Sequence, residues 1–216
     1  MSFQTAPYLR KATSRAKSDV ANKLVSMFLH DVSRRISSSI GLGVSDSRYA
    51  QAVAATFGDG CCYCGRTLEN DRAAVEHLDG MNRFRAGLHI PGNVVVSCKR
   101  CNSEKRRDDQ LPQLRLAATG WESFLSHDSS RCVSDCKTCA YWGDVFPIVP
   151  DKVKRLADSH SRILVFQSAY ADAMRFSQQA QPALHAELEA IYRECQVFAT
   201  NRITKSSEKV SAALAI

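Results

Sequence analysis

The sequence lacks any apolar run near the length of about 18 residues that a membrane-spanning helix needs. It also lacks an apolar stretch at its start, because residues 1–18 carry basic side chains without the hydrophobic segment of a secretory signal peptide. Internal repeats and low-complexity tracts are missing as well. These absences argue against a membrane protein and against an exported one, so we expect a cytoplasmic chain.

The apolar content and the charge fit a folded protein with an acidic partner. Hydrophobic residues make up 44% of the 216 residues, which is enough for a packed core. The 29 lysines and arginines exceed the 22 acidic residues and give a net charge of +7. This excess favours nucleic acid, whose phosphates release counterions when basic side chains neutralise them. Many basic proteins bind no nucleic acid, so the charge alone does not decide the partner.

Nine cysteines are many for this length, and their grouping is more informative than their number. Eight of them lie between positions 61 and 139, and only Cys195 stands apart. Disulfide frameworks are typical of secreted proteins, whereas grouped cysteines in a reducing cytosol more often bind metal. The grouping therefore predicts metal sites.

Two C-x-x-C pairs form the more regular group. Cys61 pairs with Cys64 and Cys98 with Cys101, and the two intervening residues let a tight turn present both thiolates to one zinc ion. A redox C-x-x-C motif would explain one pair but not two. We therefore predict a structural Zn²⁺ bound by four thiolates. The adjacent Cys62 is expected to be packed in the interior and not to bind the metal.

A second group, less regular in its spacing, lies further along the chain. It consists of Cys132, Cys136 and Cys139, preceded by His127. Three thiolates and an imidazole would complete another tetrahedral zinc site. Alternatively, these cysteines are reduced and pack near the aromatic residues at positions 141–146.

The segment between the C-x-x-C pairs is too long for a simple zinc ribbon and has a pattern of its own. Glu76-His77 is followed by a loop rich in Gly and Arg, then by Asn93, and then by Asn102 directly after Cys101. Over residues 58–107 this resembles the HNH nuclease family, in which an acidic residue and a His on a strand precede a middle Asn and a His or Asn on a helix.

Two features depart from the family pattern. Glu76 stands where Asp is commoner, and the usual Pro after the His segment is missing. Neither departure removes a functional group that the chemistry needs. The resemblance implies a small ββα-metal core. Together with the structural zinc predicted from the cysteines and helices predicted on the N- and C-terminal sides, this gives an α+β fold that is mainly α.

The same residues suit phosphodiester cleavage on chemical grounds. A histidine such as His77 can take a proton from an attacking water near neutral pH. Glu76 and Asn102 offer oxygen ligands, which suit a catalytic Mg²⁺ or similar divalent ion better than zinc. Neighbours on a strand face opposite sides, so we expect a bend or bulge to bring Glu76 and His77 to one site. By the resemblance, Asn93 braces the loop that orients His77.

Simpler interpretations remain open for each of these residues. His77 could be a structural histidine, Asn102 a helix N-cap, and Glu76 a surface carboxylate. His89 lies in the loop that follows Glu76-His77, and we expect it to be structural and not catalytic.

Basic residues flank the predicted core on both sides, and we expect them to contact DNA phosphates as a group. Alternatively they form a solvated charged face. The residues concerned are Arg83, Arg85, Lys99, Arg100, Lys105, Arg106 and Arg107.

Apolar periodicity predicts helices on either side of the core. We expect an arm over 1–17, helices over 18–40 and 45–57, and further helices from 151 with a break at Gln181-Pro182. Ser45 or Asp46 is expected to cap the helix over 45–57. Strands are expected over 72–78 and 93–97. This divides the chain into 1–57, 58–110, 111–150 and 151–216. The apolar faces would pack around the core or pair two copies in a homodimer.

Taken together, the sequence favours a metal-dependent DNA endonuclease. Restriction, phage defence and a phage-encoded nicking role are all compatible with it, and restriction or defence is the preferred role. The alternative from another class is a non-catalytic, zinc-stabilised DNA-binding protein, which would have no need of Glu76, His77 and Asn102 together. RNA as the substrate is a third interpretation.

Overall fold

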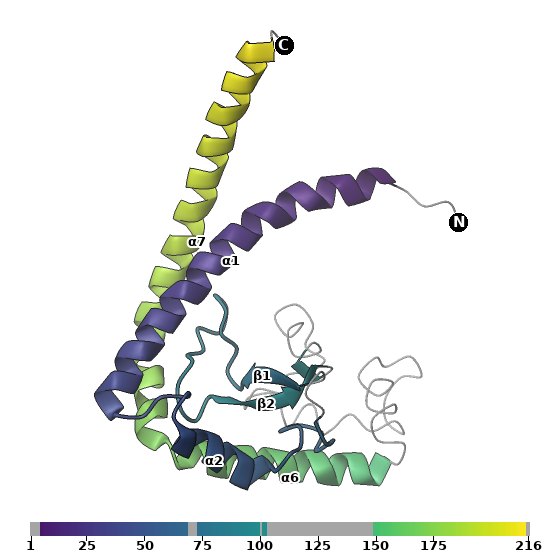
Figure 1. The fold of residues 1–216 in the computed structure, drawn as a ribbon, viewed down its shortest axis with the longest axis vertical. Coiled ribbons are helices and arrows are strands. Elements are labelled where there is room, and N and C mark those ends of the chain that lie inside the picture. Colours follow the sequence, from purple (N-terminus) through teal and green to yellow (C-terminus); the bar gives the residue numbers. More distant parts are fainter. Residues whose placement is uncertain (1–4, 69–72, 100, 103–148, 215–216) are drawn as a thin grey trace.

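The computed structural model describes residues 5–68, 73–99, 101–102 and 149–214. Within these ranges the chain forms four helices and one antiparallel pair of strands (Figure 1). The helices are α1 (Thr5–Ile40), α2 (Ser47–Phe57), α6 (Val149–Ser168) and α7 (Ala171–Leu214), and the strands are β1 (Ala73–His77) and β2 (Val94–Cys98). The predicted class is confirmed, because the fold is mainly α with a small sheet and flanking N- and C-terminal helices.

The two terminal helices are longer than the sequence predicted. The predicted arm over 1–17 is wrong from Thr5 onward, because α1 begins there and runs for 36 residues. Its sequence contains no glycine, and Pro7 lies in the first turn, where the missing N–H removes no hydrogen bond. Neither α1 nor any other helix in the described ranges combines the length and the apolar character needed to cross a bilayer.

The predicted break at Gln181-Pro182 is also wrong. Helix α7 continues through Pro182 and spans 44 residues. A proline inside a helix costs about 3 kcal/mol or more, because it removes one hydrogen bond and crowds the preceding turn. Leu184 and Leu188 just beyond it are 3% and 0% exposed. Burying two leucines contributes about 3–6 kcal/mol, which is enough to offset the proline.

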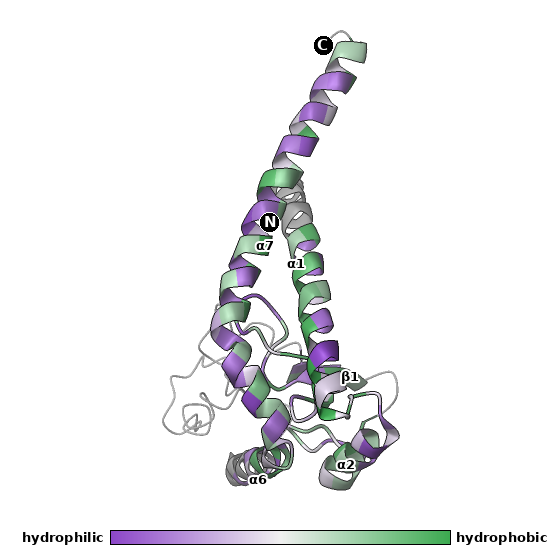
Figure 2. Ribbon diagram, turned by 90° about the vertical axis from the view of Figure 1, so that its left-hand side faces the viewer, coloured by the Kyte–Doolittle hydropathy of each residue, from purple (hydrophilic) through white to green (hydrophobic). Residues whose placement is uncertain are grey.

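Helices α1 and α7 lie side by side along their lower halves and hold the loop of residues 79–92 (Figures 1 and 2). The two helices and the loop share one apolar cluster, which is called the α1–α7 cluster below. Its buried members are Val25 and Leu29 of α1, Ala173, Leu184 and Leu188 of α7, and Ala86, Leu88 and Ile90 of the loop. A segment that reads as a polar loop is therefore anchored by its own apolar residues.

A second cluster forms around α2, α6 and the sheet. Asp46 accepts a hydrogen bond from the backbone N–H of Arg48 at 2.9 Å, which confirms the predicted cap of α2. Tyr49 and Phe57 of α2 pack against Phe166 of α6, with ring centroids 5.9 and 5.4 Å apart. The buried cysteines of the two C-x-x-C pairs belong to the same cluster.

The two strands lie close to their predicted positions and pair without interruption. The register runs from Ala73 opposite Cys98 to His77 opposite Val94. The expected bulge between Glu76 and His77 is therefore absent from β1. The sheet carries a C-x-x-C pair at one end and His77 at the other.

Candidate metal centre and adjoining cleft

A tight turn presents the first pair of thiols. The N–H of Gly65 donates to the carbonyl of Cys61, and the N–H of Cys61 donates to the carbonyl of Arg66, both at 2.8 Å. Gly65 has a φ of +67°, a left-handed conformation that glycine adopts without strain. The second pair continues β2, with Cys98 as its last residue and Cys101 in a helical conformation.

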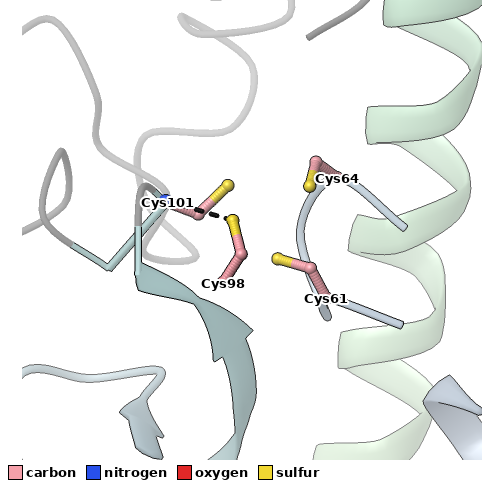
Figure 3. A group of neighbouring side chains, drawn as sticks. All are labelled: Cys61, Cys64, Cys98 and Cys101. Atoms are coloured by element: carbon pink, nitrogen blue, oxygen red, sulfur yellow. Dashed lines mark hydrogen bonds between the residues drawn. The ribbon is translucent and has the colours of Figure 1, made fainter. Parts of the chain in front are cut away.

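The four predicted zinc ligands converge on one point (Figure 3). Their Sγ atoms all lie within 4.8 Å of one another, and the residues are at most 7% exposed. Zinc–thiolate bonds of about 2.3 Å in a tetrahedron place the sulfurs about 3.8 Å apart, so a small contraction would suit the ion. The N–H of Cys101 points at the Sγ of Cys98 at 3.4 Å. None of these cysteines is in a disulfide.

The thiols also influence one another's protonation, and not all in one direction: the pKa values of Cys61 and Cys98 are lowered, whereas hydrogen bonds among the thiols and burial raise those of Cys64 and Cys101. Hydrogen bonds from neighbouring thiols, that of Cys101 first, hold the pKa of Cys61 well below its usual range. A hydrogen bond from Cys101 lowers the pKa of Cys98 to about 7. Zinc binds thiolates, so a cluster in which some thiols readily lose their protons is suited to it. The chemistry and the spacing of the four groups therefore fit a structural Zn²⁺.

Cys62 lies next to this cluster but outside the group of four convergent sulfurs. Cys62 is 0% exposed, and its backbone N–H donates to the carbonyl of Val96 at 3.1 Å. This bond joins β2 to the turn of residues 61–66, which is called the zinc turn below.

A cleft of about 330 Å³ lies beside the metal centre, bordered by consecutive residues of β1 and by Asn102. It is lined by Val75, Glu76, His77, Gly80, Met81, Asn82 and Asn102. Three of the four residues with predicted catalytic roles thus share one cleft. Glu76 and His77 both line the cleft although β1 pairs with β2 without a bulge.

Glu76 and Asn102 form one wall of the cleft. Glu76 is only 2% exposed, so the alternative that it is a surface carboxylate is wrong. The side-chain Nδ2 of Asn102 donates to Oε2 of Glu76 at 3.0 Å and to the carbonyl of Val75 at 3.1 Å. The hydroxyl of Ser97 also donates to Oε2 of Glu76, at 3.4 Å. Asn102 follows Cys101 directly, so the zinc ligands fix its position.

Asn93 closes the base of the loop of residues 79–92. Its Oδ1 accepts the N–H of Asp79 at 2.6 Å, and its Nδ2 donates to the carbonyls of Asp79 and Leu88 at 3.0 and 2.7 Å. The residue is 2% exposed. Asn93 therefore lies outside the cleft and joins the two ends of the loop.

His77 contacts His89, a residue that we expected to be structural and not catalytic. Its Nε2 lies 3.0 Å from Nδ1 of His89, and the centroids of the two rings are 5.2 Å apart. On the other side the ring of His89 lies 5.1 Å from that of His30, on α1. Burial, followed by the charge of His30, lowers the pKa of His89. One signal could have found this contact: the apolar neighbours Leu88 and Ile90 are turned into the core, which leaves His89 on the opposite side.

The basic residues that the structure describes differ in their surroundings. Arg83 approaches Glu189 at 3.5 Å, and its guanidinium lies 4.1 Å from the ring centroids of Phe84 and Tyr192. Lys99 is exposed and Arg85 half-buried. Other predicted contacts lie outside the described residues, namely Arg100, Lys105, Arg106 and Arg107, together with the second group of Cys132, Cys136, Cys139 and His127.

Comparison with family models, with curated proteins and with solved structures found no match for this chain.

Proposed function

We propose that the protein is a metal-dependent DNA endonuclease of HNH type, with one structural Zn²⁺ and one catalytic Mg²⁺ or similar divalent ion. The observation that carries the proposal is the cleft that Glu76, His77 and Asn102 line together. A protein that only bound DNA would need the zinc centre but not this combination of a base with two oxygen ligands.

Each residue has a defined task in this proposal. His77 takes the proton of the water that attacks the phosphorus atom. Glu76 and Asn102 hold the divalent ion, which would supply positive charge to the phosphate oxygens. Asn93 holds the loop that follows His77 in place through its bonds to Asp79 and Leu88. The zinc centre acts only through structure, because it fixes Cys101 and with it Asn102.

The test is cleavage of supercoiled plasmid by the zinc-loaded protein, with Mg²⁺ or Mn²⁺ added or omitted. We expect nicked or linear product only when the divalent ion is present. His77→Ala should lower the rate by about 10²–10⁴-fold, because a positioned general base contributes that much. The zinc content and the melting temperature should remain as in the wild type.

His185→Ala is the matched control, because His185 is an exposed histidine on α7. It should cut at the wild-type rate. A wild-type protein that holds its zinc but cuts no faster with Mg²⁺ or Mn²⁺ than without would refute the nuclease assignment. Equal rates for His77→Ala and His185→Ala would refute the role of His77 as base.

A further inference from the structure

A chain of three histidines leads from the cleft to α1. His77 lines the cleft, His89 contacts it through a 3.0 Å approach of Nδ1 to Nε2, and His30 lies behind His89. His89 also lines a separate cavity of about 550 Å³ on the α1 side, together with His30, Asp31 and Arg34. The ring of His89 therefore stands between that cavity and the predicted base.

We propose that His89 is a positioning residue for His77: its Nδ1 accepts a hydrogen bond from the Nε2–H of His77 and so selects the tautomer of the base. A neutral imidazole carries its proton on one nitrogen only. A proton kept on Nε2 leaves the basic lone pair of His77 on Nδ1. This inference rests on the proposed function, because it concerns the histidine to which that function gives the role of base.

The backbone on both sides of His89 is held firmly. Its own N–H donates to the hydroxyl of Ser33 on α1 at 2.8 Å, and that hydroxyl donates in turn to the carbonyl of Leu29. The carbonyl of the preceding Leu88 accepts from Asn93. Leu88 and Ile90 are both 0% exposed within the α1–α7 cluster. An acceptor fixed in this way can orient a neighbouring ring.

Burial and the neighbouring charges favour the neutral form of His89, which is the form that can accept a hydrogen bond. The titratable and charged groups facing it are His77 from β1 and His30, Asp31 and Arg34 from α1. Burial and His30 lower the pKa of His89, which favours a neutral ring with one nitrogen free to accept a hydrogen bond, and the proposal assigns this nitrogen as Nδ1 because it is the one that lies 3.0 Å from His77. A positively charged His89 would have protons on both nitrogens and could not accept from His77.

The proton balance of the step is simple. The attacking water loses one proton to Nδ1 of His77, and the oxygen of that water forms a bond to phosphorus as the bond from phosphorus to the leaving sugar oxygen breaks. The leaving oxygen takes a proton from a solvent water molecule, and His77 then returns the proton on Nδ1 to solvent. The proton on Nε2 stays where it is throughout, and His89 neither gains nor loses one. The bond to His89 strengthens during the step, because its donor becomes a cation. His89 therefore favours the protonated base without taking part in the transfer.

The test compares His89→Leu with His89→Asn. The two replacements have the same branched shape, but only asparagine places an acceptor, Oδ1, close to the former position of Nδ1. Histidine labelled with ¹⁵N reports the tautomer of each ring, and the signal of His77 is assigned by its loss in His77→Ala. We expect the Nε2–H tautomer in the wild type and in His89→Asn, and a mixture of tautomers in His89→Leu.

Activity should follow the tautomer. His89→Leu should lower kcat by about 10–100-fold with little change in KM, the size seen when a supporting hydrogen-bond partner is lost. His89→Asn should recover much of that loss, and both variants should keep their zinc. A purely structural His89 would instead give equal losses in both variants, which would overturn the inference.

The ¹⁵N spectrum of the wild-type protein tests the tautomer of His77 even if a variant fails to fold. An Nδ1–H tautomer of His77 in the wild-type protein overturns the inference by itself. The same spectrum separates the two proposals, because it needs no substrate. A protein with the expected tautomer but no cleavage would refute the proposed function alone.

Discussion

Replacing Cys98 with serine is expected to release the zinc and to unfold the part of the protein built around it. Serine keeps the size of the side chain and a hydrogen-bonding group, so the change removes mainly the thiolate. Structural zinc contributes about 10–16 kcal/mol in zinc-finger peptides, whereas a whole domain is stable by about 5–15 kcal/mol. Weakening one of four ligands in a buried cluster therefore threatens a large share of the stability.

The structure indicates how far the damage should spread. Cys98 ends β2, and the zinc turn is tied to that strand by the bond from Cys62 to Val96. The fully buried Tyr63 lies in the same turn. The α1–α7 cluster, in contrast, contains none of the four cysteines. We expect the strands and the zinc turn to lose their order while α1 and α7 remain helical.

Two measurements check this expectation: zinc content by mass spectrometry of the metal, and hydrogen exchange of peptides from each region. Cys62→Ser is the matched control, because it makes the same change in the same turn at a residue outside the group of four. It should keep the zinc and lose only about 1–3 kcal/mol, the cost of burying a hydroxyl. Stoichiometric zinc in Cys98→Ser, with strand protection as in the wild type, would refute the reasoning.

Two further predictions concern the supports of the cleft. Tyr49→Phe removes the hydroxyl that donates to the carbonyl of Val94 and accepts the N–H of Gly92 at 3.1 Å, so it should lower the free energy of unfolding in urea by about 1–3 kcal/mol. Gly87→Ala places a Cβ 2.0 Å from the carbonyl oxygen of Asp79, which the loop cannot accommodate without moving. It should lower the melting temperature and the cleavage rate together, and unchanged values of both would contradict the packing described for the loop.

Features that depend on local chemistry were predicted well. The acidic cap at Asp46 acts on an N–H two residues away, and the strands on either side of the loop follow from short β-branched and apolar runs. The spacing within each C-x-x-C pair also predicted its local geometry, because each turn presents two thiols, and the need of zinc for four ligands predicted that the two pairs would meet.

Features that depend on distant packing were not predicted. The helical conformation at Thr5 follows no apolar period, and the continuity of α7 at Pro182 depends on leucines buried against α1. The contact between His77 and His89 depends on the loop's being held between two helices that are far apart in the sequence. The periodicity of a sequence describes one helix or strand at a time. It therefore cannot predict the position of a loop residue that is held by packing against two other elements.

Asn102 in the cleft and His89 behind it are held by different means, and this has a consequence for the proposed chemistry. Asn102 is fixed by its neighbour Cys101 and so by the metal centre, whereas His89 is fixed by Ser33 and the α1–α7 cluster. Removal of zinc should therefore disturb the side that would hold the divalent ion before it disturbs the partner of the base. The proposed mechanism would need both sides at once, because a base without the ion, or an ion without an oriented base, would leave the water or the phosphate unassisted. Under that proposal the zinc centre would matter for activity even though it would take no part in the reaction.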